Sequence, residues 1–259
     1  MNQILAVPIE KDPIEKAPLP ASRWGFWATL AFSAVIAVIY AVSQGLAIGV
    51  MVGFESGVGA LGNEEELMES ISSNGSYLSV GIIFSAWMGS LAIGGAILLR
   101  KGITLKEYLA IKNLSLKTYA RWLACVLIFL FGWAMVNLVL DIPDSVWMTK
   151  TYETAGYLPL LWVAVVVVAP LIEELFFRGF LFEGLRDSWV GPVGAVLVTS
   201  LAWAAIHVQY GMLQIAIIGT LGILLGIAKL KTRSLYIPIA MHTFNNLLAM
   251  LATSLYLNS

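Results

Sequence analysis

The chain has 259 residues, a formal net charge of −1 and a mean hydropathy of +0.85. Hydrophobic residues make up 59% of the chain and charged residues 12%, about half the charged share of soluble globular proteins. This composition excludes disordered, collagen-like and disulfide-rich proteins, and the charge balance excludes a basic nucleic-acid-binding surface. We therefore expect an all-α protein, a polytopic membrane helix bundle forming a single transmembrane domain over residues 23–259.

Seven membrane-spanning helices are expected after a flexible cytoplasmic tail at residues 1–22, because a span needs roughly 20 apolar residues. The expected spans are 24–54, 77–99, 122–140, 158 to about 182, 189–228 and 235 to about 256. The stretch 189–228 is too long for one span, and the polar step Gln209-Tyr210-Gly211 divides it into two. An eighth span arises if the long first stretch folds back on itself.

The distribution of lysine and arginine predicts the orientation of these spans. Basic residues gather in the tail, in the connection 100–121, after the fourth span and between the sixth and seventh spans. The remaining connections carry one lysine, Lys150, against eight acidic residues. The N-terminus is therefore expected in the cytoplasm. Within the segment 101–117, apolar and charged residues interleave, which suits either a short helix on the inner membrane surface or an ordinary loop.

Charged residues inside the fourth span are the first functional signal. Glu173, Glu174 and Arg178 lie there, although each intramembrane charge costs roughly 2.5 to 3.5 kcal/mol on insertion scales. Glu174 and Arg178 are four residues apart and are expected to form an ion pair. Glu173 is left without an obvious local partner. Pro170, just before the acidic pair, is expected to kink or open the helix.

Both histidines of the protein, His207 and His242, also lie in apolar runs. Trp203 precedes His207 by four residues and Asn246 follows His242 by four, so each pair shares a helix face. Three helices can therefore direct Glu173, His207 and His242 toward one interior point. The expected span ends argue against a shared site, since they place His207 roughly 10 Å nearer the outer face than His242.

These residue types favour the activation of water. A glutamate with a histidine can orient a water molecule and take its proton, while a second histidine and an amide stabilise the oxyanion of a cleaved peptide bond. Glu173, His207 and His242 are also an accepted catalytic zinc set, although the sequence His-Glu-x-x-His is absent. Ser200 is a poor nucleophile candidate, because it lies seven residues before His207 and no Gly-x-Ser-x-Gly surrounds it.

The ordered motifs resemble the CPBP family, which comprises type II CAAX prenyl endopeptidases and the bacteriocin-processing and self-immunity proteins called Abi. The motifs are Glu-Glu-x-x-x-Arg, an aromatic residue four before a histidine, and His-x-x-x-Asn, from Glu173 to Asn246 within a motif-bearing core at 158–256. The family usually has phenylalanine at the position of Trp203, which keeps an aromatic wall there.

The resemblance implies an intramembrane peptidase with a cavity between its helices. Glu173 would be the water-activating base, assisted by His207. His242 and Asn246 would form the oxyanion site, although Asn245 is the alternative amide. Glu174 and Arg178 would hold the first motif in shape.

Several alternatives stay open at this stage. We favour a metal-free mechanism over zinc bound by Glu173, His207 and His242. A non-catalytic immunity or scaffold protein and a small proton-coupled transporter are the competing functions. The expected partners are the lipid bilayer and a peptide or membrane-associated protein substrate, lipidated or not, and no nucleic acid. The expected location is the plasma membrane if the protein is bacterial. Gly222-x-x-x-Gly226 predicts close helix packing.

Overall fold

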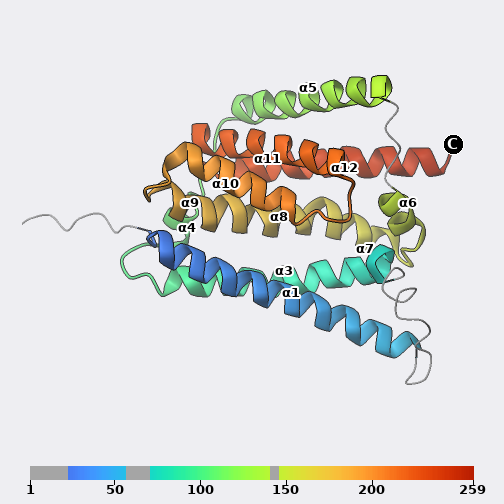
Figure 1. The fold of residues 1–259 in the computed structure, drawn as a ribbon, viewed down its shortest axis with the longest axis horizontal. Coiled ribbons are helices and arrows are strands. Elements are labelled where there is room, and N and C mark those ends of the chain that lie inside the picture. Colours follow the sequence, from blue (N-terminus) through green and yellow to red (C-terminus); the bar gives the residue numbers. More distant parts are fainter. Residues whose placement is uncertain (1–22, 57–70, 141–145) are drawn as a thin grey trace, which may run out of the picture.

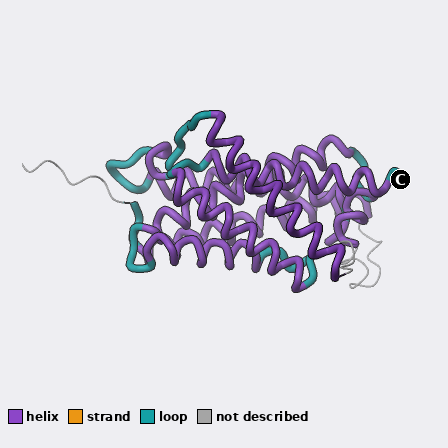
Figure 2. The backbone as a smooth tube through the Cα atoms, turned by 90° about the horizontal axis from the view of Figure 1, so that it is seen from above, coloured by secondary structure: helices purple, strands orange, loops and turns teal. Residues whose placement is uncertain are grey.

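A computed structural model describes residues 23–56, 71–140 and 146–259, and it contains helices and no strand over those ranges. The predicted flexible tail at 1–22 lies outside the described residues. The long helices run between the two ends of the molecule (Figures 1 and 2). In chain order the elements are α1 (Phe26–Ser56), α3 (Gly75–Leu98), α4 (Leu105–Tyr108), α5 (Leu116–Leu140), α6 (Val146–Glu153), α7 (Leu158–Trp162), the π-helical segment η2 (Val163–Val168), α8 (Ala169–Glu174), the π-helical segment η3 (Leu175–Leu181), α9 (Phe182–Arg186), α10 (Gly191–Ala205), α11 (Met212–Thr232) and α12 (Tyr236–Leu257).

The all-α membrane bundle expected from the composition is confirmed. Among the described residues, five helical stretches are long and apolar enough to cross a membrane: α1, α3, α5, the combined helix Leu158–Arg186, and α11. The expected fifth and seventh spans correspond to α10, with 15 residues, and α12, with 22 residues. The total of seven spans therefore stays a prediction. The first apolar stretch does not fold back, because α1 is one continuous helix of 31 residues.

The motif-bearing fourth span is the central element of the bundle. From Leu158 to Arg186 it is helical throughout, but α-helical turns alternate with η2 and η3. Pro170 lies in the first turn of α8, directly after η2, so the predicted opening of the helix occurs here as a widened π-helical segment. α8 runs between α3 on one side and α10 and α12 on the other (Figure 1).

Buried ion pairs tie the elements together at the end of the bundle where α1 begins. Glu183 of α9 is fully buried, and its carboxylate lies 2.9 Å from Nζ of Lys229, 2.8 Å from Arg186 and 3.3 Å from Arg23. Lys229 also donates to the carbonyl oxygen of Leu109. Because the sixth span was expected to end at residue 228, Lys229 was predicted to lie in the link before the seventh span. That prediction is wrong, because α11 continues to Thr232 and buries this lysine.

The connection between α3 and α5 was expected to be either a short surface helix or a loop, and it is mostly loop with one short helix. Its only helix among residues 101–115 is α4, a single turn held by a capping box between Thr104 and Glu107. Hydrogen bonds from Thr104 lower the pKa of the exposed Glu107 carboxyl. Tyr108 and Leu109 are buried against the bundle, where the Tyr108 ring stacks on Phe180. Tyr108 and Leu109 therefore pack inside the protein, whereas Leu105 is exposed, and α4 is the one helix between α3 and α5.

Candidate active site

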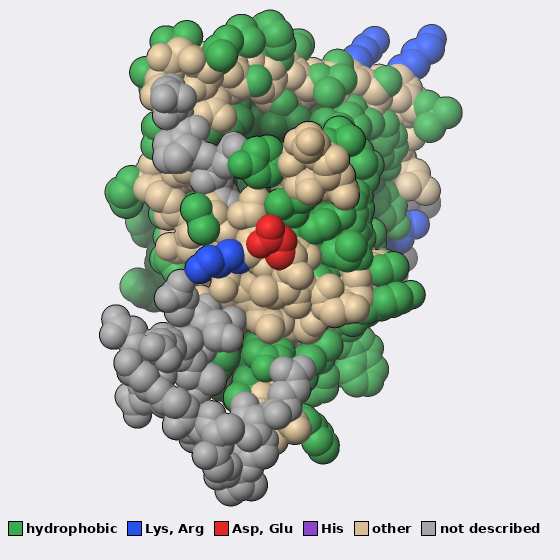
Figure 3. All heavy atoms as spheres, turned by 90° about the vertical axis from the view of Figure 1, so that its right-hand side faces the viewer, with side chains coloured by type: hydrophobic (Ala, Val, Ile, Leu, Met, Phe, Trp, Pro, Cys, Tyr) green, Lys and Arg blue, Asp and Glu red, His purple; other side chains and the backbone are tan. Residues whose placement is uncertain are grey.

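A large cavity occupies the middle of the bundle and reaches the end at which α6 lies. It has a volume of about 1250 Å³. Its walls come from α1, α3, α5, α6, the fourth span, α10, α11 and α12, and they are mainly apolar. On the face of the molecule at that end, the described surface is largely hydrophobic or neutral (Figure 3). The lining includes Glu173, His207, His242, Asn245 and Asn246, so all the predicted catalytic residues share one cavity.

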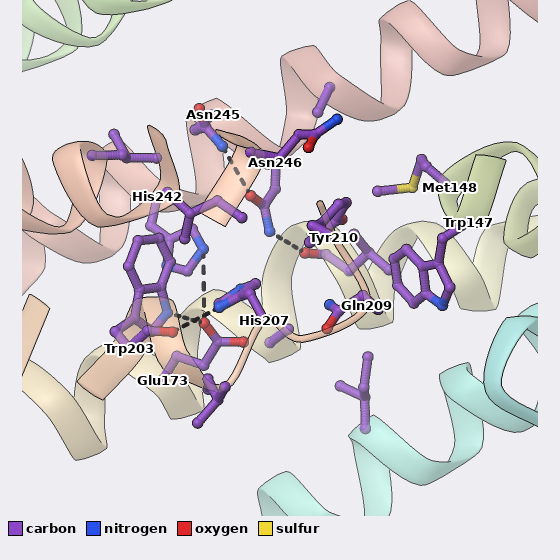
Figure 4. Close-up of a pocket in the computed structure, with 18 of the residues that line it drawn as sticks. Trp147, Met148, Glu173, Trp203, His207, Gln209, Tyr210, His242, Asn245 and Asn246 are labelled. Atoms are coloured by element: carbon purple, nitrogen blue, oxygen red, sulfur yellow. Dashed lines mark hydrogen bonds and ion pairs between the residues drawn. The ribbon is translucent and has the colours of Figure 1, made fainter. Parts of the chain in front are cut away.

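Glu173, at the end of α8, has a partner that the sequence did not suggest. The indole Nε1 of Trp203 donates a hydrogen bond to Oε2 of Glu173, at 2.5 Å (Figure 4). Within the described residues no hydrogen bond involves Oε1, and the side chain is 20% exposed. One carboxylate oxygen is therefore engaged, and the other is available to a ligand in the cavity.

His207 lies just beyond the end of α10, which stops at Ala205. Its Nδ1 is 2.7 Å from the carbonyl oxygen of Trp203. Because a carbonyl only accepts, Nδ1 must carry the hydrogen, and Nε2 of the neutral ring is then a proton acceptor. The turn at the end of α10 thus selects the tautomer suited to a base.

His242 of α12 joins the ion pair that was predicted from spacing. Arg178 Nη1 is 2.8 Å from Oε1 of Glu174, and both side chains are fully buried, which confirms that pair. His242 Nδ1 is 3.0 Å from the same oxygen, and its Nε2 is 4.0 Å from Oε2 of Glu173. Glu174 therefore orients His242 so that Nε2 faces Glu173.

Trp203 brings these groups together. Its ring meets the rings of His207 and His242 edge to face, with centroids 5.0 Å apart in both cases. Both histidine rings therefore reach the same indole in spite of the expected 10 Å offset. α10 begins at Gly191, two residues later than expected, which removes about 3 Å of that offset, and His207 lies in the turn after the helix ends at Ala205. Figure 4 shows Glu173, His207, His242 and Trp203 side by side.

Asn246 has a structural contact besides its place in the cavity. Its Nδ2 donates to the carbonyl oxygen of Val165 in η2, at 2.9 Å, and Asn245 donates to Oδ1 of Asn246 (Figure 4). Pro170 lies five residues after Val165 and has no N–H, so it cannot supply the π-helical hydrogen bond to that carbonyl. Asn246 supplies it instead, and its second N–H hydrogen remains for a ligand.

Tyr210 lines the cavity, although the sequence predicted it only as part of the polar step between two spans. Its ring stacks on His207, with centroids 6.2 Å apart, and meets Trp147 of α6 edge to face. Burial, with a further contribution from the Glu173 carboxylate, raises the pKa of the Tyr210 phenol, which therefore stays protonated at neutral pH. The only sequence signal for it was the interruption of the long apolar stretch by Gln209-Tyr210-Gly211.

The zinc alternative requires donor atoms of Glu173, His207 and His242 to converge on one point. Within the described residues, no group of three or more His, Cys, Asp or Glu side chains is arranged to hold a metal ion. Zinc bound by these three side chains stays an alternative that the metal content of the purified protein tests.

Comparisons with known proteins agree with the resemblance inferred from the motifs. Residues 155–248 match the family described as type II CAAX prenyl endopeptidase Rce1-like, and the matched range contains every predicted site residue. An uncharacterised 24.3 kDa protein of Escherichia coli is 25% identical over 170 residues, which cover 64% of this chain and 70% of that protein. No solved structure matches the chain. The five apolar helices and the family match indicate an integral membrane protein whose residues 155–248 are similar to that family.

Proposed function

We propose that this protein is an intramembrane endopeptidase that hydrolyses a peptide bond with a water molecule activated by Glu173 and His207. The observation that carries the proposal is the convergence of Glu173, His207 and His242 on one cavity, from three separate helical segments. A purely structural role for these residues would not require an open carboxylate oxygen and two histidines on the wall of a cavity of about 1250 Å³.

The first step is the attack of water on the substrate. A water between Oε1 of Glu173 and Nε2 of His207 transfers a proton to the carboxylate, and its oxygen bonds to the carbonyl carbon of the peptide. The carbonyl oxygen becomes an oxyanion. Nδ2 of Asn246 and Nε2 of protonated His242 donate hydrogen bonds to it. His242 donates from Nε2 only when it is protonated, because Glu174 already accepts from Nδ1.

The second step restores the enzyme. The carbon–nitrogen bond breaks, the leaving amine takes the proton held by Glu173, and a carboxylic acid and an amine are released. The number of atoms and the charge balance without a cofactor. Glu174 and Arg178 hold His242 in place through their buried ion pair.

The family match supports a substrate attached to the membrane. The matched family is named for CAAX prenyl endopeptidases. The cavity walls are mostly apolar and come from helices that face the lipid, such as α5, in which Val126 is the only buried residue. We therefore assign a membrane-associated peptide as substrate, with a prenylated C-terminal peptide as the first to test.

Quenched fluorescent peptides, including a farnesylated Cys-Val-Leu-Leu peptide, test the proposal on the purified protein. Wild type is expected to cleave at least one peptide, and Glu173→Gln is expected to lower the rate by at least about 1,000-fold, since it removes the base. Glu153→Gln, an exposed acid at the end of α6, serves as the matched control. Equal rates in wild type and Glu173→Gln would contradict the assignment of the base.

Metal content is measured on the same samples. The metal-free mechanism predicts that activity persists after treatment with a chelator and without stoichiometric zinc. Cleavage that requires about one zinc per chain would instead make Glu173, His207 and His242 ligands.

A further inference from the structure

We infer that Trp203 is a positioning residue for Glu173, and that its indole N–H determines which carboxylate oxygen meets the water. This inference rests on the proposed peptidase activity. The resemblance to known proteins suggested only an aromatic wall at this position, a role that phenylalanine also fulfils.

The hydrogen bond is the first part of the argument. Trp203 Nε1 lies 2.5 Å from Oε2 of Glu173, and an indole has a single N–H to donate. A hydrogen bond to an ionised carboxylate is about twice as strong as one between neutral groups. Oε2 is therefore held toward α10, and Oε1 is left as the oxygen that can accept the proton of water.

The ring that bears this N–H is held by its surroundings. Trp203 is 2% exposed. The guanidinium of Arg178 lies over its ring, 4.9 Å from the centroid. Gly222 of α11 packs closely against the ring, because a β-carbon there would lie 3.0 Å from the indole. The N–H direction is thus determined by packing and does not depend on the presence of substrate.

The groups around Glu173 show what the hydrogen bond prevents. His242 also lies near Oε2, with its Nε2 4.0 Å away. Without the indole N–H, the carboxylate of Glu173 can turn toward a protonated His242 and form a direct ion pair. That pair would occupy both the base and the oxyanion donor, so the chemical step would slow while the cavity walls that bind substrate stay unchanged.

Two substitutions at position 203 separate the N–H from the shape of the ring. Trp203→Phe keeps an aromatic ring without a donor, and benzothienylalanine at position 203 keeps the bicyclic shape with sulfur in place of N–H. Both are expected to lower kcat on the order of 10- to 100-fold, the loss typical of a hydrogen bond to a charged group, with KM changed less than about threefold. The matched control is Trp162→Phe, a partly buried tryptophan of α7 outside the cavity, which should leave kcat and KM within about twofold of wild type.

The outcomes are distinct. Loss of kcat in both variants at constant KM supports the inference. A wild-type kcat in the benzothienylalanine variant overturns it, since the N–H would then have no role. Parallel losses of kcat and melting temperature in both variants also overturn it, because they indicate a structural role alone.

A second measurement does not depend on catalysis. The infrared carboxylate band that Glu173→Gln removes is compared between wild type and Trp203→Phe, and it should shift when the indole hydrogen bond is lost. An unshifted band overturns the inference. Absence of cleavage by the wild-type protein with a shifted band would contradict the proposed function and leave the positioning of Glu173 supported.

Discussion

Arg178 shows how much a single buried residue holds in this site. Its guanidinium is fully buried and contacts Glu174, the carbonyl oxygen of Gly222 and the ring of Trp203. Through Glu174 it also supports the orientation of His242. A buried charge pair contributes little net stability compared with apolar residues, but breaking one by removing a single partner leaves an uncompensated charge.

Arg178→Ala is therefore expected to destabilise the fold by about 3 to 5 kcal/mol. The measurement is thermal unfolding of the detergent-solubilised protein. Lys231→Ala, at an exposed lysine of α11, should change the stability by less than about 0.5 kcal/mol. An unchanged melting temperature in Arg178→Ala would show that the ion pair has no supporting role.

The sequence predicted contacts within one helix and missed contacts between helices. Spacing within one helix was enough to predict the Glu174–Arg178 pair, because residues four apart always lie on one face. The bond between Trp203 and Glu173 joins residues 30 apart in sequence, and the ion pair of Glu183 with Lys229 joins two different helices. Such contacts depend on how helices pack, which no local pattern specifies.

At the scale of elements, the packing of α10 on α11 sets the position of Trp203. Gly222 lies against Trp203 and Ser200, and Gly226 lies against Val196, so the Gly-x-x-x-Gly pattern produces the predicted close packing within the chain. Ser200 is buried in this contact and does not line the cavity, which agrees with its exclusion as a nucleophile.

Gly222→Ala is expected to displace the indole and lower peptidase kcat by about tenfold, with a loss of about 1 to 3 kcal/mol from overpacking. Gly219→Ala is the matched control on the same helix, since its new β-carbon would lie 3.5 Å from Ala204, an ordinary contact distance. Activity assays and thermal unfolding of both variants test this. Equal behaviour of the two variants would show that the α10–α11 contact does not position Trp203.

Element boundaries were the less predictable part of the fold. Hydropathy located every long helix, because apolar stretches of this length have few other solutions in a bilayer. It did not show that α10 ends at Ala205, that α11 continues to Thr232, or that two π-helical segments flank α8. Arg233, in the left-handed conformation, ends α11, and η2 is accommodated by Pro170 and by the hydrogen bond of Asn246 to Val165.

At the scale of the whole molecule, the contacts agree with the predicted division of the connections between two ends of the bundle. Segments expected on the inner side meet at one end, where Arg23 contacts Asp187 and Tyr108, and Ser234 contacts Lys112. Segments expected outside meet at the other end, where Gly75 bonds to Thr154 and Trp147 packs on Tyr210.

Cysteine labelling tests this orientation. In a Cys125→Ser background, Glu153→Cys is expected to react with a membrane-impermeant maleimide on intact bacterial cells, and Lys101→Cys only after permeabilisation. Both positions are exposed. The reverse labelling pattern would place the N-terminus outside.

The central claim is that a peptide bond is hydrolysed within the bilayer by means of Glu173. The most direct measurement is mass spectrometry of the products from a farnesylated, membrane-anchored peptide in proteoliposomes that contain wild type or Glu173→Gln. The account predicts one matched pair of product peptides from wild type and none from the variant, with equal amounts of folded protein in both. The same products from Glu173→Gln at a comparable rate would contradict it.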